Sequence, residues 1–240
     1  MLEIGPGPGG LTRALLDGPA AHVTAVELDR RAVAALADLS AAHPGRLTVV
    51  EADAVKLDAA ALLPAPRKIV ANLPYNAASP LLVGWLRTAA AFEGMALMFQ
   101  QEVAERICAA PDSDAYGRLS VLAQWRCRCE LLMSLPPGAF SPPPKVWSAV
   151  VGFTPRAEDP GPALFATMER LTAAAFGQRR KMLRGSLKPL GGAEALLAAA
   201  GIDGARRAET LTIAEFDRMA RALLARGGQA PASAAATPAA

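Results

Sequence analysis

The sequence has few of the residues from which metal and redox sites are built. It contains only three cysteines and two histidines in 240 residues, which is too little material for a disulfide framework, a histidine-rich metal site or a Ser-His-Asp triad. Cys108, Cys127 and Cys129 also lack the spacing of a metal site. We therefore expect no metal and a reducing, cytoplasmic setting.

Long hydrophobic runs are missing too, although 52% of the residues are hydrophobic and 20% are charged, as in globular proteins. No apolar stretch approaches the roughly 18 residues that a membrane-spanning helix needs. The start of the chain, from Met1 to Gly5, shows neither the basic nor the apolar segment of a signal peptide. We expect no membrane association, and the length allows one large domain with a smaller second one.

Positive charge is modest overall and unevenly distributed. The formal net charge is +3. Residues 1–151 carry 13 Lys and Arg against 14 Asp and Glu, whereas residues 152–240 carry 12 against 8. The carboxyl-terminal part is therefore the better candidate for contact with a polyanion, although a solvated helical surface would show the same excess.

A strand, a glycine-rich turn and a helix are predicted at the start of the chain. Residues 1–4 are apolar enough for a short buried strand, and leucines at 11, 15 and 16 give a helical stripe. Between them, Gly5, Gly7 and Gly10 fit the G-x-G-x-x-G pattern, which is weakly specific by itself. Such a turn brings a ligand close to the backbone and to the free N–H groups of the helix.

Two further predicted strands, at residues 22–26 and 47–50, are followed by carboxylates. Glu27 comes 22 positions after Gly5, where an acidic residue commonly accepts hydrogen bonds from ribose hydroxyls. The other interpretation of Glu27 is a carboxylate near a helix N-cap. Asp53, just past the third strand, could accept a hydrogen bond from an adenine amino group. A helix is expected from residue 30 to about residue 42.

The most informative stretch is residues 71–80, which follows a predicted strand at 68–70 and precedes an apolar helical pattern expected to begin near Leu81. We expect it to form a turn at the carboxyl end of that strand, where ligands bind in α/β sheets. Asn72 offers a side-chain oxygen, Leu73 or Pro74 a backbone carbonyl, and Tyr75 a flat ring for stacking.

This set of groups suits methylation of an exocyclic amine. The lone pair of such a nitrogen is conjugated with its ring, and two acceptors that hold both N–H hydrogens favour a more nucleophilic geometry. An ordinary proline-containing turn with an asparagine cap is the alternative. The glycine turn, Glu27 and Asp53 form an adenosine-binding set, and the Asn72 turn adds amine chemistry for which a dehydrogenase has no use.

The remaining pattern completes a sheet and then changes to helices. Strands are expected at 95–99, 127–133 and 146–153, with a rigid loop at 136–146 that carries Phe140. Residues 161–226 show helical patterns without a convincing strand, with a basic cluster at Arg179, Arg180, Lys181 and Arg184. We expect a catalytic domain at 1–154, an α-helical domain at 155–226 and a disordered tail at 227–240.

Taken together, several motifs resemble the ribosomal RNA small-subunit adenine N6-dimethyltransferase family of the KsgA/RsmA type. The resemblance covers nearly the whole chain and lies in the segments Glu3–Gly7, Val26–Asp29, Asn72–Asn76, Tyr116–Ser120, Phe140–Val146, Ala175–Lys181 and Arg207–Glu209. It implies a Rossmann-like α/β methyltransferase sheet with a small α-helical carboxyl-terminal domain.

The resemblance also implies the reaction, which is S-adenosylmethionine-dependent dimethylation of N6 in two adjacent adenines near the 3′ end of 16S rRNA. The substrate would be the 30S subunit or its precursor, and the protein would work as a monomer. The implied cofactor site has Gly5, Gly7, Glu27, Asp53 and Asn72. The implied substrate residues are Asn72, Leu73 and Pro74 at the amine, Tyr75 and Phe140 at the flipped base, and Arg179, Arg180 and Lys181 at the RNA.

Two departures from the family pattern bear on function. Family members carry a segment before the first strand that covers the methionine part of the cofactor, and we expect this chain to be a fragment or to start at an internal Met. Trp147 stands where the family usually has Asp, and we expect a local packing change there. Two alternatives stay open, namely a large-subunit rRNA methyltransferase of the macrolide-resistance type and a non-catalytic RNA-binding assembly factor.

Overall fold

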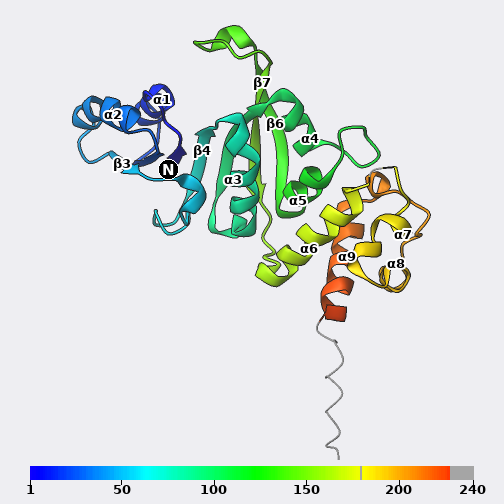
Figure 1. The fold of residues 1–240 in the computed structure, drawn as a ribbon. Coiled ribbons are helices and arrows are strands. Elements are labelled where there is room, and N and C mark those ends of the chain that lie inside the picture. Colours follow the sequence, from blue (N-terminus) through cyan, green and yellow to red (C-terminus); the bar gives the residue numbers. More distant parts are fainter. Residues whose placement is uncertain (179, 228–240) are drawn as a thin grey trace, which may run out of the picture. The chain divides into compact units, whose positions relative to one another are not determined.

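The computed structural model describes residues 1–178 and 180–227, without the side chains of Tyr75 and Asn76 (Figure 1). The chain divides into two compact units. The first, which we call the sheet unit, comprises residues 1–110 and 119–159. The second, the helical unit, comprises residues 111–118 and the chain from residue 160 onward. Each unit is described by itself.

A seven-stranded sheet forms the centre of the sheet unit, in the order β3-β2-β1-β4-β5-β7-β6. The strands from β1 to β5 pair in parallel, whereas β7 pairs antiparallel with both β5 and β6. The strands are β1 (Leu2–Ile4), β2 (Val23–Glu27), β3 (Leu47–Glu51), β4 (Lys68–Asn72), β5 (Gly94–Gln100), β6 (Cys127–Leu135) and β7 (Ser148–Pro155). The expected α/β sheet is confirmed, with strand ends within two residues of the predicted ones.

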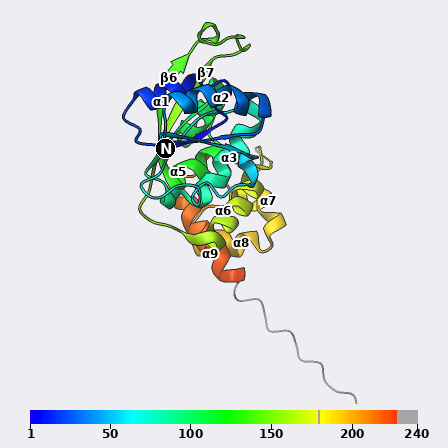
Figure 2. The ribbon, with the colours of Figure 1, turned by 90° about the vertical axis from the view of Figure 1, so that its left-hand side faces the viewer.

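Helices connect the parallel strands, as crossovers between parallel neighbours require. Helices α1 and α2 lie side by side in both views of the molecule (Figures 1 and 2). The α-helices of this unit are α1 (Gly10–Asp17), α2 (Arg30–Ala42), α3 (Tyr75–Arg87), α4 (Gln101–Cys108) and α5 (Arg118–Arg126). Short 3-10 helices are η1 (Ala54–Lys56), η2 (Ala89–Ala91) and η3 (Pro137–Ala139).

The glycine turn after β1 is held against α2 by close packing. Gly9 has a φ of +89°, and a Cβ at this position would lie only 2.8 Å from Cδ2 of Leu36 and 3.3 Å from Cδ2 of Leu39. Both leucines belong to a buried cluster with residues of α1 and of strands β2 and β3, namely Leu16, Ala20, Val23, Ala25 and Leu47. The absence of a side chain at Gly9 therefore lets the turn approach this core.

The stretch around Asn72 differs from the sequence prediction. The pattern predicts a turn over residues 71–80 and a helix from near Leu81, because proline disfavours a helix interior. Instead β4 continues through Asn72 and α3 begins at Tyr75, so that Pro80 lies inside the helix. The apolar face of α3, which includes the buried residues Leu82 and Leu86, offsets the one backbone donor that Pro80 removes.

The described residues of the helical unit form helices and connecting loops without any strand, as the sequence predicted. They are α6 (Gly161–Phe176), α7 (Leu183–Ser186), η4 (Lys188–Leu190), α8 (Ala193–Ala200), η5 (Ala208–Thr210) and α9 (Ile213–Gly227). Phe176 of α6 stacks on Phe216 of α9 with ring centroids 5.6 Å apart. This aromatic contact joins the first and last helices of the unit.

The boundary between the units is less simple than a single cut at residue 154. Residues 155–159 stay with the sheet unit, and residues 111–118 belong to the helical unit. Tyr116 explains the second difference, because its ring is fully buried and lies 6.1 Å from that of Phe176. The predicted disordered tail falls almost entirely on residues 228–240, which lie outside the described part of the chain.

The described residues contain neither a membrane-spanning helix nor a cluster of metal-binding side chains. No helix among them has the length and apolar character needed to cross a membrane. Within the same part of the chain, His, Cys, Asp and Glu side chains form no group of three or more that could hold a metal ion.

One carboxylate lies in the core of the sheet unit. Glu3 of β1 is 1% exposed, and neither of its oxygens has a hydrogen-bond partner within the described chain. Burial raises the pKa of Glu3 to about 6. The Thr12 hydroxyl lies near enough to oppose this rise in part, although it makes no hydrogen bond of standard geometry.

We predict that Gly9→Ala destabilises the protein by about 1–3 kcal/mol, because the substitution adds both a strained φ and a contact with Leu36. Gly10→Ala is the matched control, since a Cβ there meets nothing within 4 Å and the residue is helical. Urea unfolding of both variants measures the difference. Equal stability of the two would contradict the packing argument.

We predict that Glu3→Gln changes how stability depends on pH. Because the folded-state pKa is raised, the parent loses stability as the pH rises through about 4.5 to 6, where the unfolded chain ionises more readily. The variant lacks this loss, so its stability relative to the parent should improve by about 2 kcal/mol between pH 4 and pH 7.5. Denaturant unfolding at both pH values tests this, and a constant difference would rule it out.

Candidate active site

The glycine turn offers an open backbone surface at the carboxyl end of β1. Gly5 has a φ of +68° and donates its N–H to the Val26 carbonyl at 3.0 Å, which continues the pairing of β1 with β2. Gly7, with a φ of +54°, and Gly10 both have space around them, because a Cβ at either position would meet nothing within 4 Å. The turn therefore forms a backbone cradle that side chains would fill.

Glu27, the last residue of β2, binds this turn directly. Its Oε2 accepts the N–H of Gly7 at 3.1 Å, and its Oε1 accepts those of Leu28 at 2.7 Å and Asp29 at 2.9 Å. A carboxylate has about four lone-pair sites, so one on Oε2 is left for a ligand hydroxyl. Glu27 therefore orders the start of the next helix and contacts the glycine turn, and its role at a ribose stays a prediction.

Asp53 follows β3 and caps η1. Its Oδ1 accepts the N–H of Val55 at 3.0 Å, and its Oδ2 lies 3.7 Å from Nζ of Lys56. The carboxylate is half-buried. Close to Glu27 and Asp53 in the sequence are two large apolar side chains that are exposed to solvent, Leu28 at 67% and Val55 at 60%.

Leu28 and Val55 were not predicted as site residues. An apolar residue within two positions of each carboxylate would have been the signal, because such surfaces suit the faces of a purine.

The sheet brings the four predicted strand ends to one edge. Strands β3, β2, β1 and β4 are consecutive neighbours and all run parallel. Asp53, Glu27, the glycine turn and Asn72 therefore follow one another along the edge in that order. The last two are close, because a Cβ at Gly5 would lie 3.9 Å from the backbone oxygen of Asn72.

The turn after β4 consists only of Leu73 and Pro74. Asn72 is exposed as the last residue of β4, Leu73 is 2% exposed, and Pro74 is the N-cap residue of α3. The buried Leu73 side chain holds the turn to the core while the Asn72 side chain stays accessible. Tyr75 is the first residue of α3, and its side chain is outside the described part of the structure.

One of the two backbone carbonyls that the sequence left as equal candidates is engaged in the fold. The Pro74 carbonyl accepts the N–H of Ala77 at 3.0 Å and that of Ala78 at 3.1 Å. Both of its lone pairs are thereby used in starting α3. Of the two candidates, the Pro74 carbonyl is therefore the one that is already occupied.

Phe140 lies on the loop between β6 and β7, which projects beyond the sheet in both views (Figures 1 and 2). Ser148, the first residue of β7, pairs with Gln100 at the carboxyl end of β5. The loop is therefore at the same edge as the Asn72 turn. Phe140 is half-buried there and follows η3.

The basic cluster lies in the helical unit and extends from the segment after α6 into α7. Arg179 is outside the described residues, while Arg180, Lys181 and Arg184 are exposed. The segment pairs with a second one through two hydrogen bonds, from Leu183 N–H to the Arg206 carbonyl at 2.8 Å and from Arg184 N–H to the Gly204 carbonyl at 3.1 Å.

The two arginines in that second segment differ in availability. Arg206 is bound by Glu215, with Nη1 and Oε1 2.6 Å apart, and this contact lowers the pKa of Glu215 to about 2. Its neighbour Arg207 is exposed. Arg206 therefore stabilises the helical unit, and Arg207 adds to its accessible positive charge.

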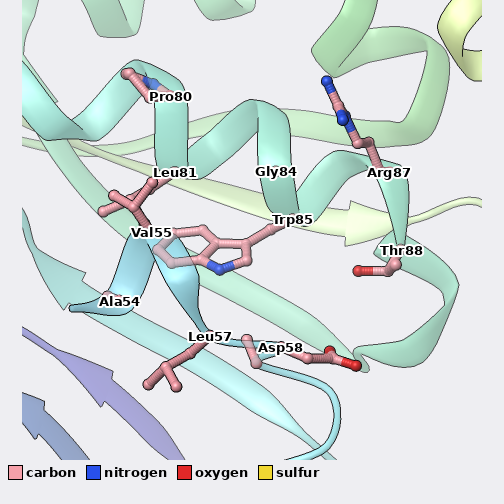
Figure 3. A pocket seen from close by; sticks show the side chains of 11 residues that line it. Ala54, Val55, Leu57, Asp58, Pro80, Leu81, Gly84, Trp85, Arg87 and Thr88 are labelled. Carbon is pink, nitrogen blue, oxygen red and sulfur yellow. The ribbon is translucent and has the colours of Figure 1, made fainter. Parts of the chain in front are cut away.

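A separate pocket of about 220 Å³ lies between η1 and α3 (Figure 3). Trp85 of α3 points into it toward η1, with Val55 and Leu81 beside the indole. None of the four strand-end groups lines this pocket. It is adjacent to the predicted site through Val55 but does not include it.

Comparison with known proteins identifies close relatives of this chain. The chain is 64% identical over 225 residues to "Ribosomal RNA small subunit methyltransferase A" of Gluconobacter oxydans, which covers 94% of this chain and 74% of the relative. A protein of the same name from Rhodospirillum rubrum is 56% identical over 227 residues, covering 95% and 79%.

Solved structures that are similar to this chain are also rRNA-modifying or adenosine-modifying enzymes by their names. A dimethyladenosine transferase from Plasmodium falciparum aligns with a TM-score of 0.73 and 25% identity over 91% of this chain and 87% of that one. The 23S rRNA methyltransferase ErmE aligns with a TM-score of 0.67 and 28% identity over 92% and 89%.

The family model described as "Ribosomal RNA adenine dimethylase" matches residues 1–224. The match spans the glycine turn, the three polar strand ends beside it and nearly all of the helical unit. The sheet is that of an S-adenosylmethionine-dependent methyltransferase with a helical carboxyl-terminal region, as the sequence predicted. The chain belongs to the ribosomal RNA adenine dimethylase family and is an S-adenosylmethionine-dependent rRNA adenine dimethyltransferase.

Proposed function

We propose that the chain dimethylates N6 of two adjacent adenines near the 3′ end of 16S rRNA, acting as a monomer on the 30S subunit or its precursor in the cytoplasm. The observation that carries the assignment of the chemistry is the adjacency of the glycine turn and the Asn72 turn at neighbouring strand ends. The relatives at 64% and 56% identity are named for the small subunit, which favours that substrate over the large subunit.

The strand-end groups fit S-adenosylmethionine. Space above Gly7 and Gly10 admits a ligand to the backbone, Glu27 retains one acceptor site for a ribose hydroxyl, and Asp53 can accept from an adenine amino group. Leu28 and Val55 offer apolar surface beside the two carboxylates. The cofactor, when bound, supplies an electrophilic methyl group on a sulfonium.

The Asn72 turn positions the amine. The side-chain oxygen of Asn72 and the backbone carbonyl of Leu73 accept the two hydrogens of N6, which directs the nitrogen lone pair toward the methyl group. Held in this way, the nitrogen could take up the methyl group that the bound cofactor would supply, and it would release a proton to solvent. The work of the turn is positioning and electrostatic stabilisation.

The target adenine must leave its stack to reach this turn. Tyr75, at the start of α3, is assigned to one face of the flipped base, and Phe140, on the β6–β7 loop at the same edge, to the other. Stacking of this kind is worth about 1–3 kcal/mol per base in comparable sites. A second adenine next to the first can then enter the same site.

Docking is assigned to the helical unit. Arg180, Lys181, Arg184 and Arg207 are exposed and lie on two segments joined by hydrogen bonds. Contacts of such side chains with phosphates fix orientation without reading sequence. Arg179 is included by its place in the sequence, although it is outside the described residues.

We predict that Asn72→Ala leaves the melting temperature unchanged, because the side chain is exposed, and lowers methyl transfer roughly 10²–10³-fold. The assay is transfer of labelled methyl groups to undermethylated 30S particles, with 50S particles as a specificity control. A variant within threefold of the parent rate would refute the role of Asn72. Methylation of 50S but not 30S particles would refute the substrate assignment.

We predict that replacing Arg180 and Lys181 by Ala weakens 30S binding and flattens its salt dependence, by a log–log slope of about 0.7–0.9 for each phosphate that the protein no longer neutralises. Arg221→Ala is the control, since it removes an exposed charge that is paired with Asp217 on α9. Filter binding across a salt series and a melting curve give the result. A lower melting temperature with an unaltered slope would mean that the cluster only stabilises the helices.

A further inference from the structure

Trp147 is a large aromatic side chain that the fold leaves on the surface. It is 51% exposed, whereas Trp85 in the same unit is 5% exposed. The packing change that the sequence predicts at Trp147 therefore concerns the protein surface and not the hydrophobic core. Its backbone is fixed, because the Trp147 carbonyl accepts the N–H of Gln101 at 2.9 Å. A positioned and exposed aromatic ring is typical of a binding surface.

The register of the sheet places Trp147 near the Asn72 turn. Trp147 directly precedes Ser148, which pairs with Gln100 at the carboxyl end of β5. Only β5 separates β7 from β4, whose last residue Asn72 pairs with Met98. Along the edge, Trp147 thus comes after the glycine turn and the Asn72 turn, on the loop that also carries Phe140.

The charges around Trp147 decide which part of a nucleotide suits it. Lys145 is exposed two residues earlier in the chain. Gln101, whose N–H binds the Trp147 carbonyl, is followed by Glu102, which lies in the first turn of α4 and forms an ion pair with Arg106. The charges close to Trp147 in the chain are thus of both signs and do not select a phosphate, whereas the uncharged face of the indole suits the face of a base.

We propose that Trp147 stacks on a nucleobase adjacent to the adenine held by the Asn72 turn. This inference rests on the proposed function and names a further substrate contact for it. Extruding one of two adjacent adenines removes a stacking partner from its neighbour. The indole replaces that partner, so that the strand next to the target is held while the amine is positioned.

Steady-state kinetics on undermethylated 30S particles give the first test. Trp147→Ala should raise KM about tenfold, with kcat within twofold and unchanged binding of S-adenosylmethionine. Trp147→Phe should restore KM, because a phenyl ring also stacks. Met133→Ala is the matched control, since it removes an apolar side chain of β6 that is 55% exposed. An equal rise in KM for Met133→Ala would indicate a general apolar contact and overturn the proposal.

Fluorescence separates base stacking from contact with a ribosomal protein. A short single-stranded RNA with two adjacent adenines should quench tryptophan emission, and an RNA with an abasic site beside the target should quench it less. Trp147→Phe should abolish the difference, whereas Asn72→Ala should retain it even if methyl transfer fails. No quenching by the RNA, together with a raised KM for Trp147→Ala on 30S particles, would assign Trp147 to a protein contact instead.

Discussion

The parallel pairing of β1 with both β2 and β4 is the constraint on which the site depends. The order of the strands reverses at β1, with β2 on one side and β4 on the other, and in open α/β sheets ligands bind at the strand ends of such a point. Short strands are enough to form this part of the sheet, and β1 itself has only three residues. The register then fixes which residues meet at the edge, because a slip of one residue would turn each side chain to the opposite face.

The first four strands and the groups at their ends could largely be predicted from local sequence. Apolar runs with strand propensity, each followed by a glycine turn or one polar residue, indicated the first four strands and the groups at their ends. The pattern predicts the Asn72 turn but places the start of α3 too late. Proline is typical of a helix boundary, whereas the buried leucines of α3 extend the helix back past Pro80 to Tyr75.

The contacts that the sequence did not reveal are long-range ones. Nothing local indicates that Tyr116 packs on Phe176 and brings residues 111–118 into the helical unit. Nor could the availability of each oxygen be predicted, because hydrogen bonds in the folded chain decide it. Glu27 illustrates this, since three N–H groups already use most of its acceptor capacity.

The use of the Pro74 carbonyl in α3 has a consequence for how this site can vary among proteins. The first hydrogen bonds of α3 occupy the Pro74 carbonyl, and in this way they limit which oxygen of the turn can serve the proposed role at the amine. A change of one residue in the length of the connection between Asn72 and α3 would alter which carbonyl starts the helix, whatever side chains the connection carries. The length of this two-residue connection should therefore be under stronger selection than the identity of the residues in it.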